Sequence, residues 1–135
     1  MRFPPRFLFA FFASYILGLF VPALVVGLVI SPSDPFEVFR GWFIEVVLPL
    51  SFIGWLGVGL PWTAIAVRDG WSVNRIKMPC VGACGGVLAL ALIALISGQL
   101  GYLAFAWFAA FQGGVTGLIF CDLANRWGLS SISED

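Results

Sequence analysis

The residues of this chain that could carry out chemistry are few, and histidine is absent. Histidine is the usual general acid and base near neutral pH, the commonest metal ligand and a frequent haem ligand. A reaction would have to depend on carboxylates, thiols or the single lysine. The sequence also has no phosphate-binding glycine loop, serine nucleophile pattern or calcium loop. We therefore predict no catalytic, cofactor-binding or metal-binding residues, and we expect that the chain is not an enzyme.

Glu45 is the one charged residue within a long apolar segment. A carboxylate near the centre of a membrane is a functional candidate, because hydrocarbon disfavours its charge. Glu45 lies about one turn past Trp42, where water and headgroups reach, and Arg40 is near enough in sequence to pair with it. The position favours an interfacial ion pair, and a coupling or selectivity role is the alternative.

Gln112 and the three cysteines are the other candidates. Gln112 stands in an apolar segment, which favours a hydrogen bond to another helix worth about 0.6–2 kcal/mol, with a substrate contact as the alternative. Cys80, Cys84 and Cys121 lack the spacing of thiol oxidoreductases or zinc ribbons. We expect them to serve as small packing residues.

Four apolar segments must position these residues. The chain is 61% apolar and 10% charged, whereas soluble domains are about 25% charged. A membrane-spanning helix needs about 20 apolar residues, and we predict such helices over about 7–30, 42–67, 78–97 and 101–121. The first segment is longer than the apolar region of a secretory signal, so we expect it to be retained. Residues 1–127 are predicted to form a single transmembrane domain, an all-α bundle of four antiparallel helices, and residues 128–135 a disordered acidic tail.

The distribution of basic residues predicts the orientation of this bundle. Only Arg40 falls in the loops of one side, and the other side carries Arg2, Arg6, Arg68, Arg75, Lys77 and Arg126. Because short cytoplasmic loops are enriched in lysine and arginine, both termini are predicted to be cytoplasmic. We expect the bilayer of a bacterial inner (plasma) membrane, with its headgroups near Arg68, Arg75 and Lys77. The balanced total charge gives no reason to expect a nucleic-acid partner.

The loop on the other side is predicted to hold a short interfacial helix over about 35–40, breaking near Gly41. Asp34 would accept at the N-cap, Pro35 would occupy the first helical position and Glu37 the third.

Small residues predict where the helices touch. Gly82 and Gly86 in the third segment and Gly113 and Gly117 in the fourth recur at four-residue spacing and lie at matched depths, so these helices should pack closely there. The first segment has its own stripe of small residues, Ala10, Ser14 and Gly18.

The second segment contains Pro49 and Pro61 with glycines between them, so it should kink or unwind locally. Broken helices line binding sites in some transporters, whereas most membrane prolines only kink a helix.

These features favour a non-catalytic accessory, assembly or modulatory subunit that packs against a larger membrane-protein partner. The alternative is a small homo-oligomeric transporter or channel that uses the broken second helix and Glu45. An enzyme acting on lipid is a third possibility, for which the sequence offers no catalytic pair.

Overall fold

Four long apolar helices dominate the structure. The computed structural model describes residues 4–40 and 43–128. Four helical stretches, Pro5–Ile30, Leu48–Arg68, Lys77–Ser97 and Leu100–Arg126, are long and apolar enough to cross a membrane. Every regular element in the described ranges is helical. In chain order they are α1 (Pro5–Ile30), η1 (Pro35–Phe39), η2 (Phe43–Val47), α2 (Leu48–Gly54), η3 (Trp55–Gly59), α3 (Leu60–Arg68), η4 (Trp71–Val73), α4 (Lys77–Ser97), η5 (Leu100–Phe105) and α5 (Ala106–Arg126).

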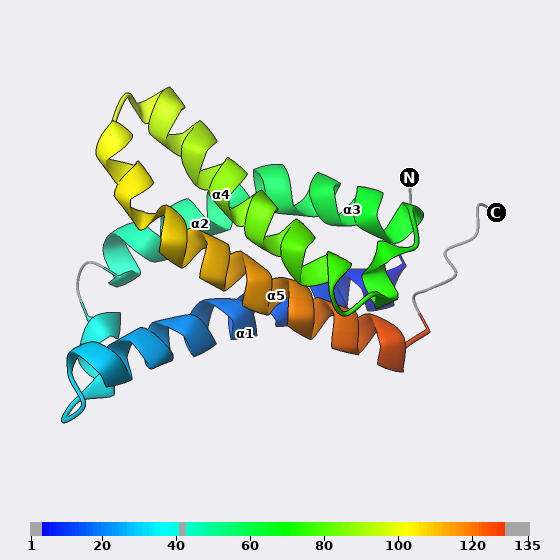
Figure 1. Ribbon diagram of the computed structural model, residues 1–135, viewed down its shortest axis with the longest axis horizontal. Coiled ribbons are helices and arrows are strands. Elements are labelled where there is room, and N and C mark those ends of the chain that lie inside the picture. The colour runs from blue at the N-terminus through cyan, green and yellow to red at the C-terminus, as the bar shows by residue number, and fades with distance from the viewer. Residues whose placement is uncertain (1–3, 41–42, 129–135) are drawn as a thin grey trace.

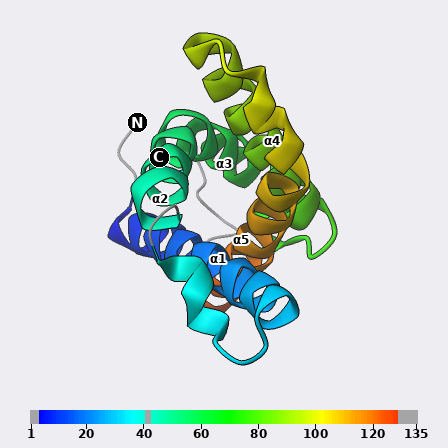
Figure 2. The same ribbon diagram turned by 90° about the vertical axis from the view of Figure 1, so that its left-hand side faces the viewer.

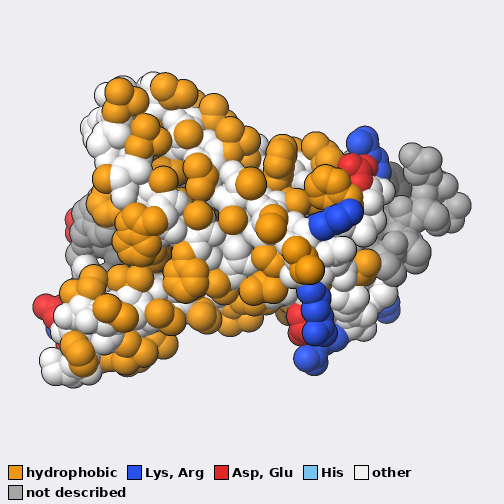
Figure 3. Space-filling view, viewed as in Figure 1, with side chains coloured by type: hydrophobic (Ala, Val, Ile, Leu, Met, Phe, Trp, Pro, Cys, Tyr) orange, Lys and Arg blue, Asp and Glu red, His pale blue; other side chains and the backbone are white. Residues whose placement is uncertain are grey.

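The outer surface is apolar between two charged ends (Figure 3). Large apolar side chains point away from the bundle, among them Val29, 77% exposed, and Ile96, 86% exposed. Soluble proteins seldom expose apolar surface on this scale, whereas lipid tails solvate it well. The length and the surface of the helices therefore both indicate a membrane protein.

Helix α5 lies between α1 and α4 (Figures 1 and 2). α4 and α5 form a hairpin, and α1 crosses the opposite side of α5. Gly98 ends α4 at a φ of 68°, a left-handed conformation that glycine adopts without strain. α2 and α3 follow one another along a single path and pack against α4.

The most tightly packed part of the bundle lies toward the end where α1 begins and α5 finishes. Phe7 and Phe11 of α1 and Phe120 of α5 are at most 2% exposed. The Phe7 ring meets Phe120 edge-on, with 5.8 Å between the ring centroids. Met78 of α4 and Ala66 of α3 join the same cluster, so every long helix contributes to it.

The predicted contact between the glycines of α4 and α5 is confirmed. A β-carbon on Gly82 would overlap the carbonyl oxygen of Gly113, and one on Gly113 would overlap that of Gly82. A β-carbon on Gly86 or Gly117 would likewise meet backbone of the facing helix, at Ala109 or Met78 respectively. The backbones approach this closely because no side chain stands between them.

The small residues of α1 are also used inside the chain. Ala10, Ser14 and Gly18 are buried, and a β-carbon on Gly18 would overlap Thr116 of α5. The stripes that suggested a partner protein are therefore occupied by contacts within this chain.

The second membrane-crossing stretch, together with η2 directly before it, forms a continuous helical path from Phe43 to Arg68, here called helix two. It contains two π-helical segments, each centred four residues before a proline. η2 precedes Pro49 and η3 precedes Pro61. Proline has no N–H, and its ring clashes with the carbonyl four residues earlier in an α-helix. The wider π turn moves that carbonyl aside. The expected disturbance at the prolines is thus a pair of π segments, with no unwound stretch between Phe43 and Arg68.

Several predicted boundaries need correction. The fourth helix ends at Arg126 and not at residue 121, because its last turn is held by the ion pair of Arg126 Nε with Asp122 Oδ2, 2.8 Å apart. The short helix Pro35–Phe39 is present, with Pro35 at its start, but Asp34 makes no capping hydrogen bond. Asp34 instead pairs with Arg40 at 3.2 Å. The predicted break near Gly41 and the predicted tail beyond Gly128 lie outside the described residues.

Candidate functional site

A polar cluster joins three helices in the middle of the bundle. Gln112 Nε2 of α5 donates a hydrogen bond to Ser51 Oγ of α2 at 2.7 Å. Tyr15 of α1 donates its hydroxyl to the same oxygen at 3.3 Å. The predicted interhelical hydrogen bond of Gln112 is therefore confirmed, with Ser51 as the partner.

Trp55 forms the aromatic neighbour of this cluster. Its indole stacks on Phe11, with 3.8 Å between ring centroids and 16° between planes. It also stacks on Tyr15, with 4.3 Å between centroids. Ser51 and Trp55 are four residues apart, as are Phe11 and Tyr15, so each pair shares one helix face. The two faces meet, and this positions the Tyr15 hydroxyl at Ser51.

These side chains line a cavity between the helices, called the interior cavity, of about 500 Å³; it is partly open to the surface, and Glu37 and Arg40 form part of its wall. Its wall is mostly apolar and aromatic, and α1, α2, α3, α4 and α5 all contribute to it. The wall includes Phe11, Tyr15, Trp62, Leu90, Phe108 and Phe120. Volumes of roughly 300–1,000 Å³ with a few polar groups are typical of small-molecule sites.

Several hydrogen-bond donors in the cavity wall have no acceptor among the described residues. Gln112 donates one of its two side-chain N–H groups to Ser51. No described residue accepts a hydrogen bond from the other N–H, from the indole of Trp55 or from the hydroxyl of Thr63, which is 9% exposed. Unpaired donors in apolar surroundings cost free energy, so this cavity suits a guest that carries an acceptor.

The indole N–H of Trp62, the next tryptophan along helix two, already has an acceptor. Its indole donates to the carbonyl oxygen of Val81 at 2.9 Å and ties α3 to α4. A β-carbon on Gly85 would lie 3.2 Å from this indole, so the glycine makes room for it. Trp62 thereby forms a fixed part of the cavity wall.

Glu45 does not belong to the cavity. Its side chain is exposed and is not among the residues that line the wall. Among the described residues, Arg40 pairs with Asp34 and not with Glu45. Pro49 and Pro61 are exposed on the outside of helix two and do not line the cavity either. Their effect on the site is indirect, through the π segments.

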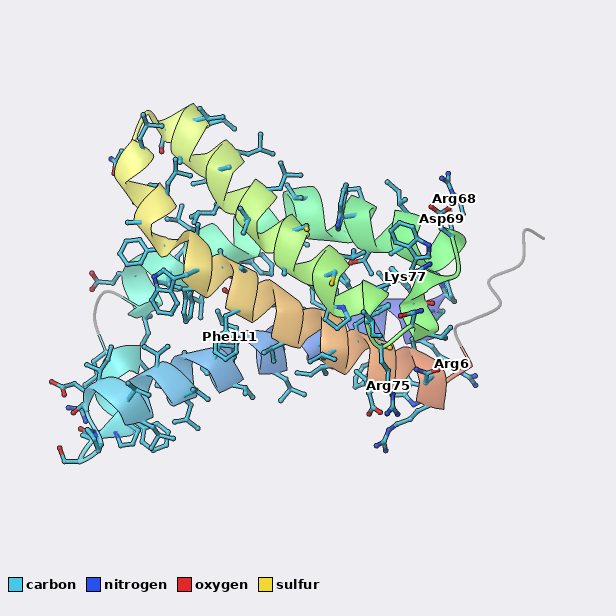
Figure 4. All side chains as sticks on the ribbon, viewed as in Figure 1. Arg6, Arg68, Asp69, Arg75, Lys77 and Phe111 are labelled. Carbon is cyan, nitrogen blue, oxygen red and sulfur yellow. The ribbon has the colours of Figure 1, made fainter. Side chains whose placement is uncertain are left out.

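The predicted headgroup residues lie together at one end of the bundle (Figure 4). Arg68 pairs with Asp69 at 3.3 Å. Lys77 lies over the Trp71 ring, 5.4 Å from its centroid. Arg75 and Arg6 extend from the same end, whereas Arg40 belongs to the opposite end beside η1.

The cysteines do not form a site. Cys121 is buried in the core, as a packing residue would be, but Cys80 and Cys84 are exposed on α4. The expectation that all three pack inside is therefore wrong for Cys80 and Cys84, whose side chains face outward. Within the described residues no three cysteine or acidic side chains gather as metal ligands.

Ser51, Tyr15, Trp55 and Thr63 were not singled out from the sequence. A serine in mid-span, six residues after Glu45, resembles many helix-packing serines. Its role depends on which residues face it. The sequence does show that Ser51 and Trp55 are four residues apart, as are Phe11 and Tyr15, and this spacing places each pair on one face of a helix.

No protein-family model, curated protein or solved structure matches this chain. The function must therefore be inferred from the cavity and the surfaces around it.

Proposed function

We propose that this chain is a non-catalytic membrane protein that binds an apolar molecule carrying a hydrogen-bond acceptor within the bilayer. The observation that carries the proposal is the cavity of about 500 Å³ between the long helices. Its unpaired donors on Gln112, Trp55 and Thr63 would be satisfied by a carbonyl or ether oxygen. A pure hydrocarbon would leave them unpaired, at a cost of about 1–3 kcal/mol for each group.

A small transporter or carrier is the function that fits this site best. The guest would sit among all the long helices, and helix two has a π segment on each side of α2. π segments are common at functional sites, and broken helices allow a local change of curvature. An ion channel is disfavoured because the wall is mostly apolar and its two charged residues, Glu37 and Arg40, carry opposite charges. Glu45 has no part in this proposal, since it lies outside the cavity.

The orientation is proposed from the charges. Arg6, Arg68, Arg75, Lys77 and Arg126 lie at one end of the bundle, and Arg40 lies at the other with Asp34 and Glu37. Short cytoplasmic loops are enriched in basic residues. We therefore place the start of α1 and the end of α5 on the cytoplasmic side of a bacterial inner membrane.

An accessory subunit of a larger membrane complex is the second candidate. It is favoured by the outer face of helix two, where Ile53 is 62% exposed and a β-carbon on Gly57 would have no atom within 4 Å. A partner helix could approach closely at that glycine. The stripes on α1, α4 and α5 do not favour it, because they are filled internally.

Photochemical labelling tests the cavity. Benzophenone is a neutral aromatic ketone that cross-links to nearby C–H groups under ultraviolet light. We expect adducts on residues of the cavity wall in the detergent-purified chain. Leu90→Trp should abolish them, because Leu90 lines the cavity. Leu92→Trp is the matched control, because Leu92 is 41% exposed on the outside of the same helix. Equal labelling of both variants would refute the proposal.

Native mass measurement in mild detergent separates the two candidates. A single chain or homo-oligomer that retains a small apolar molecule supports the transporter or carrier. A stable complex with a different protein, lost on Gly57→Leu, supports the accessory subunit.

A further inference from the structure

A second hollow lies between the first turn of α1 and the last turn of α5. It is shallow and open to the surface, and it is lined by Pro5, Arg6, Phe9, Arg126 and Trp127. None of these residues lines the interior cavity. We call this hollow the Arg6–Arg126 groove. It belongs to the end of the bundle that also carries Arg68, Arg75 and Lys77 (Figure 4).

The groove presents more positive than negative charge. Within the described residues, no ion pair or side-chain hydrogen bond involves Arg6. Arg126 uses Nε to bind Asp122 Oδ2 at 2.8 Å, and this leaves its two terminal nitrogens for another acceptor. The planar guanidinium group matches the oxygens of a phosphate and can donate to two of them.

The remaining wall of the groove is apolar. The Phe9 ring is 64% exposed and lies 5.4 Å, centroid to centroid, from the Trp127 ring. Tryptophan favours the boundary between headgroups and acyl chains. A ligand in this groove would therefore meet cationic groups at the end of the bundle and aromatic surface toward the membrane.

We propose that the Arg6–Arg126 groove binds one anionic phospholipid. Its phosphate lies between the two guanidinium groups, and the start of an acyl chain lies along Phe9. Basic pockets between membrane helices at the cytoplasmic side bind anionic headgroups in this way. Because Arg6 and Arg126 belong to different helices, the bound lipid joins the beginning of α1 to the end of α5. This site is independent of the guest in the interior cavity.

The test is lipid titration of the full chain, followed by native mass spectrometry. Phosphatidylglycerol and phosphatidylcholine of equal acyl length serve as the two probes. We expect phosphatidylglycerol to bind more tightly in the parent chain. A basic residue that contacts an anionic headgroup contributes about fivefold to lipid binding, so the double variant Arg6→Gln, Arg126→Gln should lose roughly 25-fold. Arg68→Gln removes the same charge from the same end, but Arg68 pairs with Asp69 and does not line the groove, so the affinity should change less than twofold.

All of these substitutions are at exposed side chains, and unchanged thermal melting of the lipid-free variants will show that they fold. Equal binding of the two lipids by the parent chain would overturn the proposal, as would a double variant that keeps its preference for phosphatidylglycerol. Glu134 and Asp135 have the same sign of charge as a phosphate, so a second experiment removes those charges. If phosphatidylglycerol binds only after Glu134→Gln and Asp135→Asn, these acidic residues and not a lipid are the ligand of the groove, and the proposal fails.

Discussion

Gln112 of α5 and Ser51 of α2 are joined by a hydrogen bond of 2.7 Å in the interior of the bundle. Tyr15 of α1 reaches the same serine oxygen at 3.3 Å. One hydroxyl group thus connects three helices. Hydrocarbon offers no alternative partner to these groups, so the cluster restricts the rotation of each helix about its own axis.

Removing the serine should cost more than removing the glutamine. Ser51→Ala leaves both the Tyr15 hydroxyl and the Gln112 amide without their acceptor, and we expect it to lower the free energy of unfolding by about 1–3 kcal/mol. Gln112→Leu leaves the Tyr15 bond in place and should cost less. Unfolding by denaturing detergent measures both. Gln99→Leu, at an exposed turn, is the control. If Ser51→Ala behaves like this control, the cluster does not stabilise the bundle.

The glycine contact of α4 with α5 should be intolerant of side chains. Gly86→Leu and Gly117→Leu place a side chain where the facing backbone already lies. Overpacking typically costs about 1–3 kcal/mol, and we expect at least the upper part of this range, seen as a lower melting temperature. Leu92→Ile, on the exposed side of α4, should have little effect.

Disulfide cross-linking tests the same contact between α4 and α5 without forcing the helices apart. A β-carbon on Gly114 would lie 3.9 Å from the β-carbon of Ala83 on the facing helix and would overlap no backbone. Cysteines at 83 and 114, in a background without the native thiols, should therefore form a disulfide on mild oxidation. If no disulfide forms and leucine at Gly86 is tolerated, the two helices do not touch at these residues.

Trp55 should be the tryptophan whose loss costs most. It stacks on both Phe11 and Tyr15 at centroid distances of 3.8 and 4.3 Å. Trp→Ala at a packed position costs about 3–5 kcal/mol, and Trp55→Ala should also release Tyr15 from Ser51. Trp107→Ala, at a tryptophan 60% exposed, should cost far less in the same unfolding measurement. Equal losses for the two variants would show that the stack does not hold α1 against helix two.

The sequence was sufficient to predict the long helices and the contact between α4 and α5. Apolar length predicts membrane-crossing helices directly. Gly82 and Gly86 could be matched with Gly113 and Gly117 because one tight turn joins their helices and fixes their relative depth. Gln112 could be assigned a hydrogen bond because an unpaired amide in hydrocarbon is costly.

The cavity could not be predicted because it depends on helix two. Each π segment adds a residue to one turn and so rotates everything that follows. The face shown by Ser51 and Trp55 then no longer follows from a period of 3.6 residues. The predicted end of the fourth helix fell short for a different reason: Asp122 interrupts the apolar run, but its ion pair with Arg126, one turn further on, lies within the helix.

Pro61 should be responsible for the second π segment. In Pro61→Ala, residue 61 regains an N–H that can bond to the carbonyl of Gly57, so the segment Trp55–Gly59 should become α-helical. The residues after it would then rotate by about 100° relative to those before it, because each residue of an α-helix covers that angle. Trp62 should lose its bond to Val81, which is 2.9 Å long in the parent chain. The indole N–H resonance of Trp62 reports this change.

Pro5→Ala, at the start of α1, is the control for this measurement. An unshifted Trp62 resonance in Pro61→Ala would show that contacts other than the proline impose the π turn.

The contact between α5 and the loop before α4 determines which residues face the same side of the membrane. Asn125 Nδ2 lies 3.4 Å from the carbonyl oxygen of Val73, so the end of α5 stands beside the loop between α3 and α4. Residues 76 and 128 must therefore face the same side, whatever that side is. The basic residues at this end predict that it is cytoplasmic. Single cysteines at Ile76, Gly128 and Ser33, in a background without native thiols, should be distinguished by a membrane-impermeant maleimide.

All three of these positions are exposed, whereas Ser72 in the same loop is fully buried and would give no signal. In intact cells we expect labelling at Ser33→Cys alone, and in opened cells labelling at all three. Labelling of Gly128→Cys but not Ile76→Cys in intact cells would contradict the contact between α5 and the loop. Labelling of both, with Ser33→Cys protected, would keep the fold and reverse the orientation.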